Sequence, residues 1–277
     1  MVENPIELEK LNSIKRLTQF SNLDKKKLKE MKDAFLEAVR KRATERKVGV
    51  MFSGGIDSTM IAAVAKNFTE VVLYSVGTKN SEDLKFAEEV DEELQLSLRI
   101  KILNEEEAIE TYKKVQRLID FKDFLQVELA IPVFLCSEMA KEDGIKVLLS
   151  GQGAEALFAG YDRHLKCYLN GGNLRKMLLD ELLNLNATDL DRDMETAMLN
   201  QCELRYPFLD YKFIELVWSI KPELNLSKNG EKKLVLKKIA KELKTPEIAY
   251  ERPKRAMQYG SGIHKILIRA ARKNLIS

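Results

Sequence analysis

The sequence has few of the residues on which several common kinds of protein site depend. Among 277 residues there are 2 histidines and 3 cysteines, and the cysteines lie far apart at Cys136, Cys167 and Cys202. Two histidines exclude a His-rich metal site. An odd, scattered set of cysteines without a CxxC pair argues against a disulfide framework, a zinc site or thiol redox chemistry. We therefore expect the three thiols to be buried and free.

Long apolar runs are also lacking. No run approaches the roughly 20 residues that a bilayer-spanning helix needs. The N-terminal segment MVENPIELEK does not have the basic and then apolar layout of a signal peptide. Apolar residues make up 45% of the chain and charged residues 32%, which is the composition of a globular protein with a sizeable core. These features predict a cytoplasmic protein with no membrane association.

Charge of both signs is plentiful but unevenly placed. Residues 228–277 contain 14 Lys and Arg against 4 Asp and Glu, whereas residues 48–227 contain 19 against 31. The partner of such a basic tail could be a nucleic acid, a polyphosphate or another segment of the chain. Charge alone does not choose among these three partners.

Short apolar runs alternate with amphipathic stretches in the first part of the chain. Strands are predicted at 48–52, 71–76, 98–103 and 146–150, and helices at 24–47, 56–66, 81–94 and 128–142. This alternation predicts an α/β fold with a parallel, doubly wound sheet. After about Tyr161 the pattern is mostly helical, at 165–183, 188–200, 211–219, 230–243 and 262–274. We expect an N-terminal helical extension over 1–47, an α/β core over 48–163 and a helical C-terminal region over 164–277.

The strongest local motif is Ser53-Gly54-Gly55-Ile56-Asp57-Ser58, between the first predicted strand and its helix. The glycines let the backbone approach an oxyanion, and the helix N-terminus offers free N–H groups and a partial positive charge. Ser53 and Ser58 add hydroxyl donors. Asp57 beside a phosphate requires a cation between them, so it is predicted to bind Mg²⁺. A glycine turn with an aspartate cap is the alternative, and the strand–loop–helix context favours the phosphate site.

This motif resembles the SGGxDS pyrophosphate loop of the N-type ATP pyrophosphatases, or PP-loop proteins. Further segments resemble asparagine synthetases and β-lactam synthetases, in the same order along the chain. They are Tyr74–Gly77 with Asp83-Leu84, Leu149–Tyr161, Glu203–Asp210, and Arg252-Pro-Lys254 before Gly260. The resemblance covers about residues 48–265. It implies an adenine nucleotide α-hydrolase-like fold and an ATP- and Mg²⁺-dependent ligase that adenylates a carboxylate, forming AMP and pyrophosphate.

The resemblance also implies roles for individual residues. Those that should frame the adenosine are Met51, Val76, Ser150 and Gly151. Those that should hold the pyrophosphate are Ser53, Gly54, Gly55, Asp57 and Ser58, with Asp57 and Glu155 as Mg²⁺ ligands. Lys254, Glu155 and Gln152 are the implied catalytic residues. A fixed cation such as Lys254, aimed at charge developing on the α-phosphate, is worth roughly 3 kcal/mol or more in a dry site. A solvated lysine in a basic tail is the alternative for Lys254.

The chain departs from the family's SGEGSDE segment. Gln152 stands where asparagine synthetases have a glutamate near the reacting carboxyl, and glutamine can neither act as a base nor carry charge. Glu155 keeps the carboxylate of an Mg²⁺-binding aspartate on a longer arm, and Ala156 replaces a further acid. The chain is therefore expected to keep the binding of ATP and Mg²⁺. The changes at Gln152 and Ala156 argue against asparagine as its product.

The start of the chain also departs from asparagine synthetases, which begin with a glutaminase domain whose nucleophile is a cysteine directly after Met1. Val2 stands at that position here, and some 47 residues precede the first predicted strand, so no glutaminase is expected. Nitrogen would come from ammonia, another amine or a separate glutaminase subunit. A homo-oligomer is a further option.

Other interpretations of the sequence remain beside the ligase hypothesis. Glu203 and Arg205 are interpreted as a buried ion pair that braces the turn at 207–210. A tRNA-modifying enzyme on the same fold would explain the basic tail, but the tail has few aromatic residues to stack on bases. With so few aromatic residues in the tail, nucleic acid is not the expected partner.

A third hypothesis is a regulatory protein that binds ATP without turnover. Gln152 and Ala156 favour this hypothesis, whereas the presence of Asp57 and Lys254 argues against it.

Overall fold

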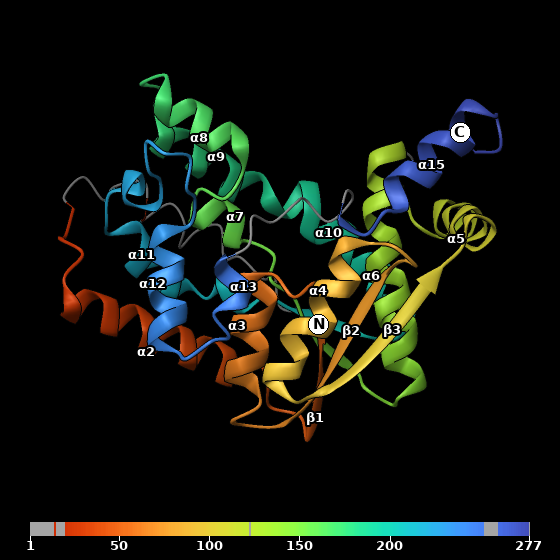
Figure 1. The fold of residues 1–277 in the computed structure, drawn as a ribbon, viewed down its shortest axis with the longest axis horizontal. Coiled ribbons are helices and arrows are strands. Elements are labelled where there is room, and N and C mark those ends of the chain that lie inside the picture. Colours follow the sequence, from red (N-terminus) through yellow and green to blue (C-terminus); the bar gives the residue numbers. More distant parts are fainter. Residues whose placement is uncertain (1–13, 15–19, 122, 252–259, 277) are drawn as a thin grey trace.

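A parallel five-stranded sheet lies at the centre of the computed structural model, which describes residues 14, 20–121, 123–251 and 260–276 (Figure 1). The strand order is β3-β2-β1-β4-β5. The strands are β1 (Lys47–Met51), β2 (Glu70–Thr78), β3 (Ser97–Leu103), β4 (Val147–Leu149) and β5 (Glu203–Arg205). The apolar runs in β1, β2 and β4 are buried, as expected for central strands of a parallel sheet.

The order of the strands reverses once, beside β1. From β1 the chain steps to β2 and then to β3, and it then returns to place β4 on the other side of β1. In sheets of this kind ligands bind at such a switch point, outside the carboxyl ends of the strands. The loops that follow β1 and β4 are therefore expected to form a ligand-binding site.

Helices cover both faces of the sheet, which confirms the doubly wound prediction. On one face α3 (Ile56–Ala65) packs beside α4 (Glu82–Leu94), and on the other α5 (Glu105–Leu118) packs beside α6 (Phe124–Glu142) (Figure 1). All ten residues of α3 are buried. This follows from its composition, because Asp57, Ser58 and Thr59 are its only polar side chains.

The chain after β4 is mostly helical, as predicted. It forms α7 (Ala154–Leu157), α8 (Asp162–Leu169), α9 (Leu174–Leu185), a π-helical turn η1 (Asn186–Leu190), α10 (Asp191–Met198), α11 (Tyr211–Trp218), α12 (Leu234–Glu242), α13 (Ile248–Glu251) and α15 (Ile263–Arg272). Short 3₁₀ turns lie at Pro207–Leu209 and Pro222–Asn225. Among the described residues, no helix is both long and apolar enough to cross a membrane.

The N-terminal helix α2 (Lys25–Arg40) packs on this helical region, against α11 and α12. Its Phe35 ring lies 4.9 Å from that of Phe208 and 5.2 Å from that of Phe213. Trp218 is 3% exposed and lies in the core of this region. Asp24 caps the helix, which ends at Arg40, before the expected residue 47.

Further elements differ from the sequence prediction. Helix α5 was not predicted, α6 begins at Phe124 before the expected residue 128, and the helix expected over 165–183 is divided into α8 and α9. The division falls at two glycines, of which Gly171 has a left-handed φ of +68° that ends the first helix.

The pair formed by Glu203 and Arg205 also differs from its interpretation. These residues belong to strand β5, and the Glu203 side chain is 43% exposed, so the pair is not buried. Arg205 donates to Glu203 and, through two nitrogens at 2.8 Å, to Glu45 before β1. It therefore joins the ends of two strands at the side of the sheet.

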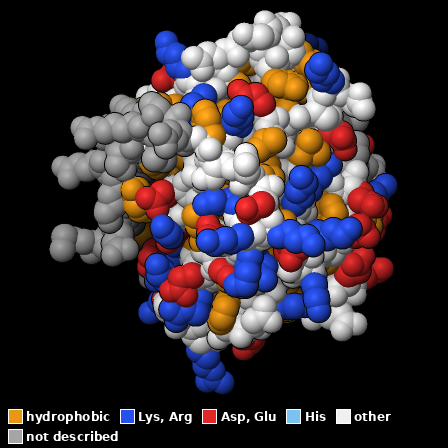
Figure 2. Space-filling view, turned by 90° about the vertical axis from the view of Figure 1, so that its left-hand side faces the viewer, with side chains coloured by type: hydrophobic (Ala, Val, Ile, Leu, Met, Phe, Trp, Pro, Cys, Tyr) orange, Lys and Arg blue, Asp and Glu red, His pale blue; other side chains and the backbone are white. Residues whose placement is uncertain are grey.

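Figure 2 shows the face of the molecule that lies on the left in Figure 1, where α2, α11 and α12 are found. Lysine and arginine side chains are numerous on this face, but acidic side chains lie among them. Two of the lysines on these helices are paired, Lys29 with Asp33 at 2.5 Å and Lys212 with Glu215 at 2.7 Å. This face thus presents mixed charge.

Candidate functional site

The predicted phosphate loop follows β1 and meets the loop that follows β4. Gly54 has a φ of +68°, which lets the chain turn sharply from the strand into α3. A Cβ atom on Gly151 would lie 2.9 Å from the Cβ atom of Asp57, so the two loops touch with no room for a side chain. The switch point is therefore formed by the two motifs that the sequence singled out.

The loop is held in shape by its own hydroxyl groups. Ser58 Oγ accepts from the Ser53 backbone N–H at 3.3 Å and donates to the Gly55 carbonyl at 3.2 Å. Ser53 Oγ accepts from the Gly55 N–H at 3.4 Å. The Asp57 side chain lies in the first turn of α3, where the helix dipole favours negative charge.

A buried lysine lies between the two predicted Mg²⁺ ligands. Lys233 Nζ is 2.9 and 2.8 Å from the two carboxylate oxygens of Asp57 and 2.9 Å from Oε1 of Glu155. The side chains of Lys233 and Asp57 are 9% and 6% exposed. Burial by itself would lower the pKa of Lys233, but the attraction of Asp57 and Glu155 outweighs it and holds the pKa above its ordinary value. The lysine is therefore a permanent cation.

The donor set around Lys233 fits Mg²⁺. The second carboxylate oxygen of Glu155, Oε2, is buried and has no hydrogen-bond partner, so it is available to a cation. Among the described residues no group of three or more His, Cys, Asp and Glu side chains is arranged to hold a metal. Mg²⁺ is commonly bound by one or two carboxylates together with substrate phosphates. Asp57 and Glu155 match that arrangement.

Gly160 makes room for both charged groups. A Cβ atom at this position would overlap Glu155 Oε2 and Cε of Lys233. Gly160→Ala should cost about 1–3 kcal/mol of stability, since both neighbours are flexible ends that can shift, and should weaken Mg·ATP binding by about 10- to 100-fold. Calorimetric titration with Mg·ATP and thermal unfolding measure the two effects.

The matched control is Gly172→Ala, whose Cβ atom would meet Cys167 Sγ at 2.8 Å, among residues outside the site. It should lose some stability and keep the affinity for Mg·ATP. If Gly160→Ala bound Mg·ATP as tightly as this control, the arrangement of Glu155 and Lys233 would have no part in nucleotide binding.

A cavity of about 350 Å³ opens beside Glu155. Its wall includes Gln152 and Ala156, the two positions at which the sequence departs from asparagine synthetases. The other lining residues are Gly153, Glu155, Tyr161, Arg163, Asp180, Glu181, Asn184, Leu185, Thr188 and Asp189. Four carboxylates thus face a single arginine, and that arginine is paired with Glu181 at 2.7 Å. The cavity carries an excess of negative charge.

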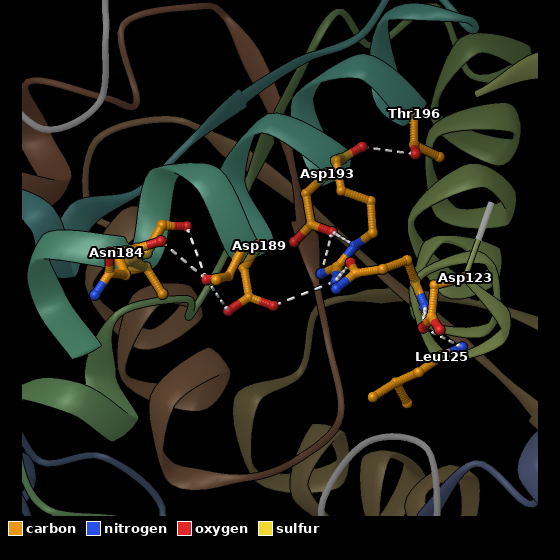
Figure 3. Close-up of polar contacts among 10 residues, drawn as sticks. Asp123, Leu125, Asn184, Asp189, Asp193 and Thr196 are labelled. Carbon is orange, nitrogen blue, oxygen red and sulfur yellow. Dashed lines mark hydrogen bonds and ion pairs between the residues drawn. The ribbon is translucent and has the colours of Figure 1, made fainter. Parts of the chain in front are cut away.

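One wall of the cavity is supported by a buried arginine. Arg192, which is 2% exposed, binds Asp189 at 3.2 Å, Asp193 at 2.7 Å and Gln126 at 2.7 Å. Figure 3 shows Asp189 and Asp193 directed at this guanidinium. Burial raises the pKa of Asp193 to about 6 although Arg192 opposes the shift. Because Asp189 lies on the π-helical turn, the network fixes a cavity carboxylate on an irregular segment.

The residues predicted to frame the adenosine lie at the same edge of the sheet. Met51 ends β1, Val76 lies near the end of β2, and Ser150 follows β4, where its Oγ accepts from the Gln152 N–H at 3.3 Å. Their implied contact with adenosine remains a prediction. Lys254 lies outside the described residues.

Each of the two histidines is hydrogen-bonded to a glutamate. His164 is fully buried and bonds to Glu181 at 2.9 Å, while His264 bonds to the buried Glu128 at 3.0 Å. The free thiols Cys136 and Cys202 are buried, and Cys167 is half-buried.

Two residues of the site were not predicted from the sequence, Lys233 and Asp189. Lys233 is one of two adjacent lysines in a basic stretch, and its neighbour Lys232 pairs instead with Asp162 on the surface. Lys233 is the N-cap of α12, where Ser, Thr, Asp or Asn is usual, but the helix expected over 230–243 puts it inside a helix, so nothing in the sequence marked it. Asp189 lies in a stretch with ordinary helical spacing and gives no signal.

The sequence was compared with known proteins. The family model described as asparagine synthase matches residues 30–173 and 168–277. A Methanocaldococcus jannaschii protein assigned as a glutamine-hydrolysing asparagine synthetase is 42% identical over 260 residues, covering 82% of this chain and 48% of its own. The asparagine synthetase of Gallus gallus is 31% identical, covering 82% of this chain and 42% of its own. For asparagine synthetase B of Escherichia coli the identity is 28%, with 73% and 39% covered.

These relatives are longer than the chain, which spans about half of their length or less. The match nonetheless runs through every part of the site described above, from Ser53 to Lys233. This chain belongs to the asparagine synthase family.

Proposed function

We propose that the chain is an ATP-dependent ligase that adenylates a carboxylate, releasing pyrophosphate, and then transfers the acyl group to an amine with release of AMP. The observation that supports this best is the convergence of Asp57 and Glu155 on one buried cation beside the phosphate loop. A cavity suited to a second substrate opens on Glu155. Nucleotide and acceptor could therefore meet at this carboxylate.

On the nucleotide side, the loop at 53–58 would bind the β- and γ-phosphates through its backbone N–H groups and the N-terminus of α3. Asp57 and Glu155 would hold Mg²⁺, which supplies charge neutralisation to the leaving pyrophosphate. Lys233 is close enough to these carboxylates to reach the same phosphates. Such positioning and fixed charge are the main sources of catalysis in transfers at phosphorus.

On the acceptor side, the charge of the cavity favours an amine. Asp180, Glu181 and Asp189 line it in addition to Glu155, so the loss of acids at positions 152 and 156 does not leave it neutral. An ammonium group would be attracted there, and a second carboxylate would be repelled. We propose that the amine binds beside Asp189 and that the acceptor carboxylate lies nearer the phosphate loop.

The two steps balance in atoms and charge. A carboxylate oxygen attacks the α-phosphorus, the bond from that phosphorus to the bridging oxygen of the β-phosphate breaks, and pyrophosphate leaves. The amine nitrogen then attacks the acyl carbon, the acyl–oxygen bond to AMP breaks, and the amine loses a proton. Asp189, held by Arg192, is placed to accept that proton directly or through water.

Product analysis with Mg·ATP tests this function. We expect AMP and pyrophosphate with a suitable carboxylate and amine, and little asparagine from aspartate and ammonia, because Gln152 cannot supply the charge of the usual glutamate. Gln152→Glu should change the preference among acceptors more than it changes ATP affinity. Glutamine should not serve as the nitrogen source for the isolated chain.

Other products would overturn these statements one by one. Strong asparagine formation from aspartate and ammonia by the unmodified chain would show that Gln152 is a neutral change. Formation of ADP and phosphate would contradict adenylation. Tight binding of Mg·ATP without pyrophosphate release across a broad panel of acceptors would instead support a regulatory ATP-binding protein.

A further inference from the structure

Lys233 occupies the position at which two carboxylates would otherwise hold a divalent cation. We propose that Lys233 is a built-in counter-ion, which fills this position in the nucleotide-free chain and leaves it when Mg²⁺ arrives with a triphosphate. The proposal rests on the proposed function in one respect, that Mg·ATP is the ligand of this site.

The charges around Lys233 explain why the lysine and a free metal ion exclude each other. Lys233 lies between the carboxylates of Asp57 and Glu155 and is itself only 9% exposed. Mg²⁺ bound to the same carboxylates would lie close to the charge of Lys233, at distances where repulsion is strong in a poorly solvated site. Triphosphate oxygens offset this repulsion, because they supply negative charge to both cations.

The backbone of Lys233 shows that the chain does not place a lysine here for the benefit of the helix. The residue has φ of +57° and ψ of 31°, in the left-handed region that side chains with a Cβ atom rarely adopt. It also puts a cation at the N-terminus of α12, where the helix dipole disfavours positive charge. Its contacts with Asp57 and Glu155 therefore explain why a lysine is found at this position.

The side chain of Lys233 is well suited to change partners. Lysine is a point charge on a flexible four-carbon stem, so Nζ can turn from the carboxylates to a phosphate without movement of the backbone. A Cβ atom at Gly160 would overlap Cε of Lys233, so glycine at this position is what lets the lysine stem lie here. Binding of metal and nucleotide therefore becomes interdependent. The triphosphate attracts Lys233 away from the carboxylates, and Mg²⁺ can then bind the carboxylates.

The experiment measures Mg²⁺ binding to the nucleotide-free chain, by calorimetry and by thermal unfolding over a titration of MgCl₂. Wild type should bind Mg²⁺ weakly and show little stabilisation. Lys233→Met, which keeps the length but removes the charge, should be less stable without Mg²⁺ and should bind Mg²⁺ about ten-fold or more tightly. The matched control is Lys232→Met, whose lysine pairs with the 81% exposed Asp162 and which should behave as wild type.

A double variant tests whether the gain in Mg²⁺ affinity depends on the charge of Asp57. In Lys233→Met/Asp57→Asn one carboxylate loses its charge, so the gain in Mg²⁺ affinity should disappear while stability recovers. A Lys233→Met chain that folds only when Mg²⁺ is present supports the proposal. A Lys233→Met chain whose Mg²⁺ response equals that of wild type, or that stays unfolded with Mg²⁺ while the double variant folds, overturns it.

Failure of this proposal can be told apart from failure of the proposed function. Mg·ATP binding and pyrophosphate release are measured on wild type, whereas the counter-ion is tested without nucleotide. A wild type that releases pyrophosphate, together with an unresponsive Lys233→Met, would leave the ligase standing and remove only the counter-ion.

Discussion

Asp57→Asn should reduce Mg²⁺-dependent pyrophosphate release by about 100- to 1,000-fold, the usual cost of losing one fixed electrostatic group in an active site. Asparagine keeps the shape of the side chain but not its charge, so both Mg²⁺ and Lys233 lose a partner. Asp57 accepts from Lys233 through both oxygens, at 2.9 and 2.8 Å. The measurements are steady-state pyrophosphate release and calorimetric affinity for Mg·ATP.

The matched control for this variant is Asp162→Asn. Asp162 also pairs with a lysine, Lys232 at 2.5 Å, but its side chain is 81% exposed and solvent screens the pair. It should leave pyrophosphate release and Mg·ATP affinity near the wild-type values. Circular dichroism of both variants separates a lost site from a lost fold. Equal Mg·ATP affinity in Asp57→Asn and wild type would refute the assignment of Asp57 as a metal ligand.

Arg192→Met should destabilise the chain by about 3–5 kcal/mol at a pH where Asp193 is ionised, because it strands a buried carboxylate. Arg192 donates to Asp193 through Nε at 2.9 Å and through Nη2 at 2.7 Å, and Asp193 is 6% exposed. Methionine fills much of the space but offers no donor. Urea unfolding followed by circular dichroism gives the free energy of unfolding of each variant.

The loss of stability in Arg192→Met should depend on pH in a defined direction. Burial already raises the pKa of Asp193 to about 6 in the folded chain, above its ordinary value, and removing Arg192 raises it further. A group whose pKa is raised by folding stabilises the folded state fully below its unfolded pKa, about 3.9 for aspartate, and this contribution is lost as pH rises through the folded pKa. The penalty should therefore be small near about pH 4, grow as the pH rises through 6, and be complete only above the higher pKa that Asp193 has in the variant.

A double variant shows whether the charge or the packing matters. Arg192→Met/Asp193→Leu removes both members of the pair, and replacing a buried ion pair by apolar side chains is often nearly neutral. It should recover most of the stability at neutral pH. It should not recover activity, because Asp189 in the cavity still lacks the guanidinium that holds it. If the double variant recovered activity together with stability, the proposed role of Asp189 in the acceptor site would be wrong.

The sequence predicted the first half of the site because its signals are local. The glycines and serines of the 53–58 loop shape one turn between one strand and one helix, so their neighbours in space are their neighbours in sequence. The resemblance added Glu155, which lies on the short helix α7 after β4. The pairing of Asp57 with Glu155 could then be expected from the parallel sheet, whose carboxyl ends lie together.

The rest of the site depends on how distant segments return to the sheet. Lys233 lies 176 residues after Asp57 in sequence and reaches it only because α12 packs on α2 and α3. No periodicity or motif distinguishes it from the other basic residues of the tail. Strand β5 was missed for a related reason, since its three residues include two charged side chains and take their strand geometry from pairing with β4.

Helix α5, by contrast, could have been found. Asn104 accepts from the Glu107 N–H while the Glu107 side chain accepts from the Asn104 N–H, and this capping box is visible in the sequence. The buried residues Ala108, Tyr112 and Val115 follow at helical spacing. The high charge of the segment obscured a regular amphipathic helix.

The pairing of β4 with β5 has a consequence for the order in which the chain can fold during synthesis. Strand β4 ends at Leu149, but its outer partner begins only at Glu203, so β4 is an edge strand until the ribosome has delivered more than fifty further residues. An apolar edge of this kind, Val147–Leu149, is a template for pairing with other chains while it is exposed. Strand β5 then covers β4 and becomes the edge itself, and two of its three side chains are charged. Residues 203–205 therefore exchange an apolar edge for a charged one, which is less suited to pairing with other chains.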